Sequence, residues 1–167
     1  EHLAIEWDGA AEGAPVFVAG HPGSTDRLLT VAQLKAQRDV YLPFWLLRMS
    51  ELRGRLIQFS KSGAEAARRA KDILDTIENS LKVRRMEQVA LNDDAMMQAR
   101  AADERTLQEA VQADPALRAA AGGAWDEIAK AVQAERAILV PYVFLEGGAG
   151  FNSDLFAYAR QLVRAAD

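Results

Sequence analysis

Few residues in this chain are of a type that performs chemistry, and most of them have an ordinary structural explanation. His21 and Ser24 lie in the stretch Gly20–Leu34, GHPGSTDRLLTVAQL, where a histidine could act as a general base and a serine as a nucleophile. A serine nucleophile also needs a partner base and an oxyanion hole, and the sequence contains no Gly-x-Ser-x-Gly elbow. We therefore interpret both residues as parts of a turn that precedes a helix.

Paired carboxylates and a glycine-rich run are the next candidates. Asp93–Asp94 and the pair Asp72 and Asp75 could exchange protons, but acidic residues near helix starts normally cap the helix or interact with its dipole. Gly147–Gly150 could cradle a phosphate, yet no lysine follows it and no strand precedes it. These patterns favour caps and a loop over catalysis or phosphate binding.

Basic residues are concentrated in the first third of the helical region, where they could bind phosphate or an acidic peptide. Glu51, Glu65 and Asp72 are interspersed among them, which is typical of a solvated helical face. That interpretation is the preferred one. The basic residues are Arg48, Arg53, Arg55, Lys61, Arg68, Arg69 and Lys71.

Asn79 is the less obvious candidate. At about 100° per residue, it points away from the apolar stripe that contains Ile77 and Leu81. Asparagine inside a helix costs only a few tenths of a kcal/mol relative to alanine. Periodicity alone therefore favours a plain surface residue at this position.

Composition limits the classes of protein to which the chain can belong. The 167 residues are 50% hydrophobic and 26% charged, with a formal net charge of -4, which is ordinary for a globular domain and argues against a general nucleic-acid binder. Zero cysteines exclude disulfides and thiolate metal sites, and His2 and His21 alone argue against a multi-histidine site. No apolar run is long enough to span a bilayer, so no membrane contact is expected.

The first thirty residues have the pattern of strands and turns. His2–Trp7 alternates roughly between polar and apolar residues, Gly9 and Gly13 mark turns, and Pro15–Ala19 has the pattern of a second short strand. Two strands do not form a stable sheet alone. This segment is therefore expected to belong to a larger unit in a longer protein.

The pattern becomes helical at Thr30, which is a candidate N-cap with Gln33 in the position of a capping box. The first helix is expected to stop near Leu42, with Pro43 as the first residue of the next helix. Later breaks or caps are predicted at Ser62–Gly63, Asn92–Asp94, Asp114–Pro115, Gly122–Gly123, Pro141, Gly147–Gly150 and Ser153.

Three stretches together resemble the bacterial family-46 serine peptidases. They are EGAPVFVAGHPGSTDRLLTVAQL around the Gly-His-Pro-Gly turn, ENSLK at Glu78–Lys82, and the C-terminal FNSDLFAYARQLVRAAD. The second is similar to the family's Asn-x-x-Lys helix motif. The likeness covers nearly the whole chain, and its motifs occur in the family's order.

The resemblance implies a mainly α fold: a helical cap domain at residues 31–167, preceded at residues 1–30 by two short strands from the edge of a chymotrypsin-like barrel. It implies a dipeptidyl aminopeptidase that releases dipeptides from peptide N-termini, with no cofactor or metal. The catalytic His, Asp and Ser are expected outside this chain, so the isolated chain should be inactive. Asn79 would help to bind the substrate's free α-amino group. Met86 stands where the family usually has glycine, which could reshape the cleft.

Partners and location follow from the same resemblance. The expected substrates are peptides with a free N-terminus, and neither nucleic acid nor a membrane is expected as a partner. The parent protein could form a homodimer. Its expected location is periplasmic or secreted. Two alternatives remain open: a non-catalytic helical module that binds another protein, and a peptidase homologue that has lost its triad.

Overall fold

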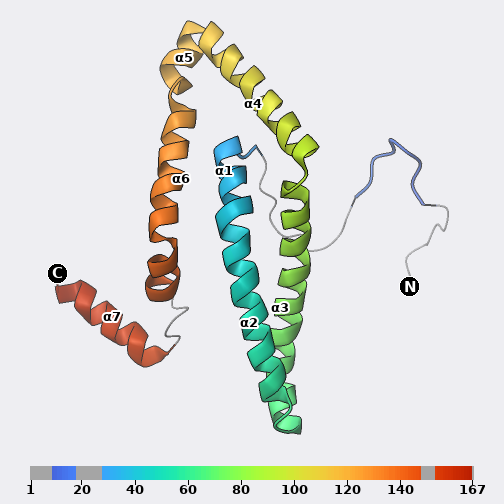
Figure 1. The fold of residues 1–167 in the computed structure, drawn as a ribbon, viewed down its shortest axis with the longest axis vertical. Coiled ribbons are helices and arrows are strands. Elements are labelled where there is room, and N and C mark those ends of the chain that lie inside the picture. Colours follow the sequence, from blue (N-terminus) through green and yellow to red (C-terminus); the bar gives the residue numbers. More distant parts are fainter. Residues whose placement is uncertain (1–8, 18–27, 148–152, 167) are drawn as a thin grey trace.

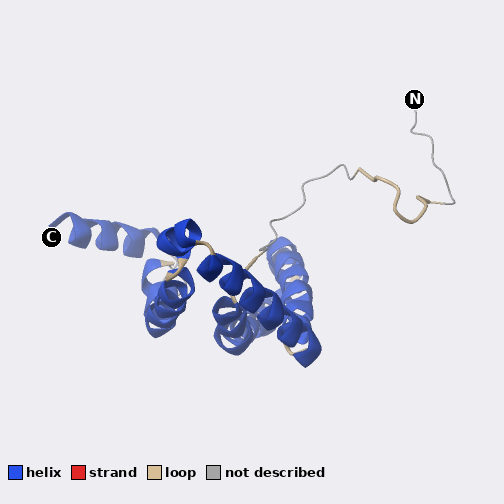
Figure 2. Ribbon diagram, turned by 90° about the horizontal axis from the view of Figure 1, so that it is seen from above, coloured by secondary structure: helices blue, strands red, loops and turns tan. Residues whose placement is uncertain are grey.

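Helices make up nearly all the regular structure of the computed structural model, which describes residues 9–17, 28–147 and 153–166 (Figures 1 and 2). The prediction of a mainly α fold is confirmed for these residues. In chain order the elements are α1 (Val31–Ala36), the π-helical segment η1 (Gln37–Tyr41), α2 (Leu42–Ser60), α3 (Ala64–Leu91), α4 (Asp94–Ala113), α5 (Pro115–Ala121), α6 (Ala124–Pro141), the π-helical segment η2 (Tyr142–Glu146) and α7 (Asp154–Ala166).

The two expected strands are not seen in the described residues. Residues 9–17 contain a turn but no strand, and Val16 and Phe17 are 67% and 97% exposed. An extended segment without a neighbouring strand has no partner for its main-chain hydrogen bonds. The strand prediction is therefore wrong for residues 15–17. His2–Trp7 and residues 18–19 lie outside the described residues, so the barrel-edge assignment of residues 1–30 stays a prediction.

The helical part begins with the predicted capping box. The Gln33 N–H donates to the Thr30 hydroxyl at 3.3 Å, and the Thr30 N–H donates to the Gln33 side-chain carbonyl at 2.9 Å. The next main-chain donor, the Val31 N–H, bonds the Glu104 carboxylate on α4 at 2.6 Å. These bonds satisfy donors that the first helical turn leaves without partners, and one of them joins α1 to α4.

Residues 31–60 form one continuous helical rod, which corrects the prediction of a break near Leu42. Pro43 does lie in the first turn of α2, as predicted. The chain accommodates it by widening to a π-helix over η1, where the Leu42 N–H bonds the Gln37 carbonyl five residues back. The lack of an N–H at Pro43 therefore widens the helix locally and does not end it.

Helices α2 and α3 lie side by side and antiparallel, joined by a tight turn at Gly63 (Figure 1). Gly63 has φ of +148°, a conformation that L side chains rarely adopt. The α3 side of the contact is apolar, since Ala70, Ile77 and Leu81 are buried there. The predicted apolar stripe therefore marks the packed face of α3, although Ile73 within it remains half exposed.

Helices α4, α5 and α6 form an arch over this pair (Figure 1). α4 and α5 continue from the end of α3, and α6 returns beside α1 (Figure 1). The predicted caps are confirmed: Asp93 accepts from the Ala95 and Met96 N–H groups, and Asp114 accepts from the Ala116 and Leu117 N–H groups. The sequence signals for helix starts thus correctly locate the corners of the arch.

The last helix, α7, points away from the others (Figures 1 and 2). The Ser153 hydroxyl caps it by accepting from the Phe156 N–H at 3.3 Å. Arg160 binds the main-chain carbonyls of Leu145 and Glu146, and Arg164 forms an ion pair with the Glu146 side chain. Polar contacts therefore attach α7 to η2, while Leu155 and Leu162 on α7 stay largely exposed.

Candidate functional site

Asn79 lies exposed on the side of α3 that faces away from α2. Ile77 and Leu81, two residues before and after it, are 6% and 1% exposed within the packed interface. A step of two residues turns a helix by about 200°, so neighbours at that spacing point to the opposite side. The structure therefore places Asn79 where periodicity predicts it.

No described residue occupies the side-chain amide of Asn79, so this amide can bind another molecule. Neither Asn79 nor Lys82, one turn further along α3, makes a side-chain hydrogen bond or ion pair with a described residue. Asp75, one turn before, is engaged by the Lys71 ammonium at 2.6 Å, and this bond raises the pKa of Lys71. An unoccupied amide offers one carbonyl acceptor and two N–H donors to a ligand.

An ion pair ties the helix to its neighbour right beside this amide. The Arg53 guanidinium on α2 donates to the carboxylate of Glu78, the residue that precedes Asn79. Their side chains are 42% and 49% exposed, so the pair contributes little to stability. The pair links the turn of α3 that carries Asn79 to α2, while the buried Ile77 and Leu81 hold that turn in place.

Two exposed apolar side chains continue the same face toward the C-terminal end of α3. Val83 and Met86 lie four and seven residues after Asn79 and are 45% and 64% exposed. Residues at these spacings share one side of a helix. We call this surface the Asn79 face; its residues are Asn79, Lys82, Val83 and Met86.

A cavity of about 770 Å³ lies between the α1–η1–α2 rod, the end of α3, and α6 with η2. No sequence pattern indicates this cavity, because its walls come from segments far apart in the chain. Apolar side chains dominate the walls, among them Leu42, Trp45 and Leu139. Asn79 is not part of these walls, and the α3 residues that are, such as Arg84, lie closer to its C-terminal end.

Tyr41 is a cavity residue that sequence reasoning missed. Its hydroxyl is buried and makes no hydrogen bond of normal geometry with a described residue. Burial raises the pKa of Tyr41 to about 12, and the nearby Glu135 carboxylate acts in the same direction. A neutral phenol is therefore held at the cavity wall at all physiological pH values.

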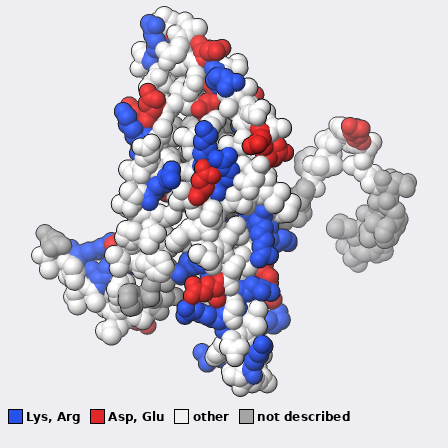
Figure 3. Space-filling view, viewed as in Figure 1, with Lys and Arg blue, Asp and Glu red and all other residues white. Residues whose placement is uncertain are grey.

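The predicted basic zone is a face of mixed charge, and Figure 3 shows acidic and basic side chains next to one another along α2 and α3. Arg48 lies over the Phe144 ring, 5.3 Å from its centroid. Four other basic residues are paired with carboxylates: Arg53 with Glu78, Arg55 with Glu51, Arg68 with Glu65 and Lys71 with Asp75. The Arg68 contact lowers the pKa of Glu65.

The other sequence candidates form no catalytic group in the described residues. His2, His21 and Ser24 lie outside those residues, as does most of Gly147–Gly150. The described ranges also contain no group of three or more His, Cys, Asp or Glu side chains placed to hold a metal ion. No described helix combines the length and the apolar character needed to cross a bilayer.

Comparison with known proteins gives one match. The family described as Peptidase S46 matches residues 1–167, which is the whole of this sequence. Searches among curated proteins and among solved structures gave no significant match. The family assignment therefore depends on the sequence pattern of the entire chain.

Proposed function

This chain belongs to the Peptidase S46 family, and we propose that it is part of the helical cap of a serine-type dipeptidyl peptidase in which Asn79 binds the substrate's α-amino group. The peptidase would be periplasmic or secreted. It would release dipeptides from peptides with a free N-terminus. The residues that carry out acyl transfer would come from other parts of the protein.

The observation that carries this proposal is the amide of Asn79, which makes no hydrogen bond with a described residue and lies on an exposed helical face of a chain in the Peptidase S46 family. The amide oxygen can accept a hydrogen bond from the substrate ammonium. Hydrogen bonds to charged groups contribute about 1.5–3 kcal/mol. An acetylated or internal peptide segment has no ammonium to donate, so the same contact would favour exopeptidase over endopeptidase cleavage.

Support for a positioning role comes from how α3 is held. Leu81 and Ile77 fix one side of the helix against α2, and the Arg53–Glu78 ion pair adds a weak surface contact beside the amide. A binding group on a packed helix loses little conformational freedom when a ligand arrives. The helical cap would thus present a preorganised acceptor to the peptide N-terminus.

The test is Asn79→Ala in the full-length peptidase, assayed with a dipeptidyl fluorogenic amide. We expect kcat/KM to fall roughly tenfold to a hundredfold, the equivalent of one charge-assisted hydrogen bond. Asn79→Asp should retain more activity than Asn79→Ala, because a carboxylate also accepts from an ammonium. Gln133→Ala, an exposed amide on α6, is the control. An unchanged kcat/KM in Asn79→Ala would remove Asn79 from the site.

A further inference from the structure

We propose that the cavity between the α1–η1–α2 rod and α6 binds a small molecule that has an apolar body and one ammonium group. The walls of this cavity are apolar except for the Tyr41 hydroxyl, two glutamines and three charged side chains. None of the four residues of the Asn79 face is among them. The inference is therefore independent of the proposed function.

The size and the walls of the cavity suit such a ligand. Its volume of about 770 Å³ is within the range of about 300–1,000 Å³ that small-molecule pockets occupy. Leu42 and Leu139 are 1% and 8% exposed, so packing holds these parts of the wall in place. Trp45 and Val132 are half-buried and Tyr142 is 59% exposed. An aromatic or branched aliphatic body would remove their apolar surface from water.

The Tyr41 hydroxyl gives this apolar site a polar anchor. It is buried and makes no hydrogen bond of normal geometry with a described residue. A buried polar group without a partner is unusual in a folded protein, because nothing compensates for the water that it has lost. The phenol oxygen accepts a hydrogen bond from an ammonium group, so a ligand with that group would supply the partner.

The charges around the cavity favour a cation. Arg84 Nη1 and Glu87 Oε2 lie 3.9 Å apart, so these two charges largely offset each other. Glu135 makes no ion pair with a described residue. Burial is the main cause of the raised pKa of Tyr41, and the Glu135 carboxylate then raises this pKa by more than the Arg136 guanidinium lowers it. A ligand ammonium at the Tyr41 hydroxyl would therefore meet net negative charge.

The two anchoring groups come from different parts of the fold. Tyr41 belongs to η1 and Glu135 belongs to α6. A ligand that binds both would connect the rod to α6, and a ligand that binds only the folded protein stabilises it.

The experiment titrates the full-length peptidase with tryptamine and with tryptophol, which carries a hydroxyl in place of the amine on the same indole body. Calorimetry is carried out in the Asn79→Ala background, so that an ammonium bound at Asn79 does not contribute. We expect saturable binding of both probes, with an affinity for tryptamine about two- to fivefold higher than for tryptophol. Glu135→Gln should remove this difference by weakening tryptamine alone. Glu127→Gln, at an exposed position on α6 outside the cavity walls, is the control and should preserve it.

A second pair of variants tests the place of binding independently of charge. Val132→Phe fills part of the cavity and should lower the affinity for both probes by about threefold or more. Val140→Phe makes the same change at a 53% exposed position on α6 outside the walls and should alter neither affinity.

Three outcomes would overturn the inference: no saturable tryptamine binding, equal effects of Glu135→Gln and Glu127→Gln, or tryptamine binding unaffected by Val132→Phe. Failure of the proposed function is measured separately, because it depends on the kcat/KM of Asn79→Ala rather than on the affinity for either probe.

Discussion

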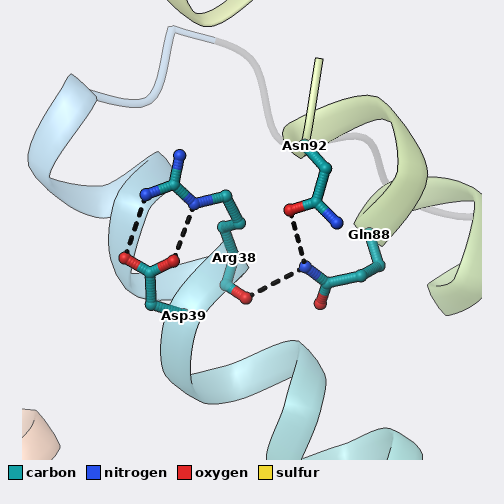
Figure 4. A network of polar contacts seen from close by, with 4 residues as sticks. All are labelled: Arg38, Asp39, Gln88 and Asn92. Carbon is teal, nitrogen blue, oxygen red and sulfur yellow. Dashed lines mark hydrogen bonds and ion pairs between the residues drawn. The ribbon is translucent and has the colours of Figure 1, made fainter. Parts of the chain in front are cut away.

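The side-chain amide of Gln88 donates a hydrogen bond to the main-chain carbonyl of Arg38 at 3.1 Å, across 50 residues of sequence (Figure 4). This carbonyl has lost its helical partner, because the Leu42 N–H bonds Gln37 and Pro43 has no N–H to offer. The same amide donates to the Asn92 side chain at 3.3 Å. A residue on α3 thus completes the hydrogen bonding of the π-helical segment η1.

Gln88→Glu should destabilise η1, because a carboxylate cannot donate to the Arg38 carbonyl and would place an acceptor against it. The contact is part-buried, and a carbonyl shielded from water and left without a donor costs about 1–3 kcal/mol, which sets an upper range of roughly 5- to 150-fold faster amide exchange if opening is local. Hydrogen exchange of the amides in residues 37–46 measures this. Gln98→Glu makes the same change at an exposed position on α4 and should leave these amides unaffected; equal exchange in both variants would contradict the prediction.

Pro43→Ala should reduce the dependence of η1 on Gln88. Alanine restores an N–H at the position that would otherwise bond the carbonyl of Arg38 or Asp39, so the helix can supply its own donor. A double-mutant cycle tests the coupling. The cost of Gln88→Glu, read from the same exchanging amides, should be smaller in the Pro43→Ala background by about 0.5 kcal/mol or more. Additive effects would show that the proline is not the reason for the contact.

The error at Leu42 shows what local sequence signals can and cannot predict. Thr30 with Gln33 and Asp114 with Pro115 correctly locate helix starts, since these caps involve only neighbours in the chain. Pro43 also signals a local disturbance, but whether a helix breaks or widens depends on a donor from another helix. Gln88 is that donor, and no spacing rule connects it to Arg38.

Leu81→Ala should destabilise the part of α3 that carries Asn79 far more than Arg53→Gln does. Leu81 is 1% exposed between α2 and α3, and truncating such a leucine to alanine costs about 2–5 kcal/mol. The Arg53–Glu78 pair is solvent-exposed, so Arg53→Gln should cost no more than about 1 kcal/mol. The hydrogen-exchange protection of the main-chain amides in α3 measures the cost of each substitution.

Val89→Ala, at an exposed position on α3, is the control for truncation. It should change the free energy of opening by less than about 0.5 kcal/mol. A larger loss from Arg53→Gln than from Leu81→Ala would mean that the ion pair, rather than apolar packing, holds the helix that carries Asn79.

The candidate site was predictable only to the extent that it follows helix periodicity. The opposite orientations of Asn79 and Leu81 follow from their spacing on one helix. The neighbours of Tyr41 in the cavity wall do not follow from spacing on one helix. Glu135 and Leu139 belong to α6 and come close to Tyr41 only when the whole arch has folded. Periodicity assigns a residue to a face, whereas the neighbours of that face depend on tertiary packing.

Tyr41→Phe should be nearly neutral at pH 7 and stabilising at high pH. The buried hydroxyl makes no normal hydrogen bond with a described residue, so its removal should change the free energy of unfolding by less than about 1 kcal/mol. Burial raises the pKa of Tyr41 from 10.0 to about 12, so the folded state holds this proton more tightly than the unfolded state. That contribution is fully present below pH 10 and is lost as pH rises toward 12. Denaturant unfolding of the wild-type and Tyr41→Phe proteins at pH 7 and at pH 11 should therefore show a difference that grows with pH in favour of the variant. Tyr158→Phe, at an exposed position on α7, should show no such growth, and parallel pH profiles for Tyr41→Phe and the wild type would refute the assignment.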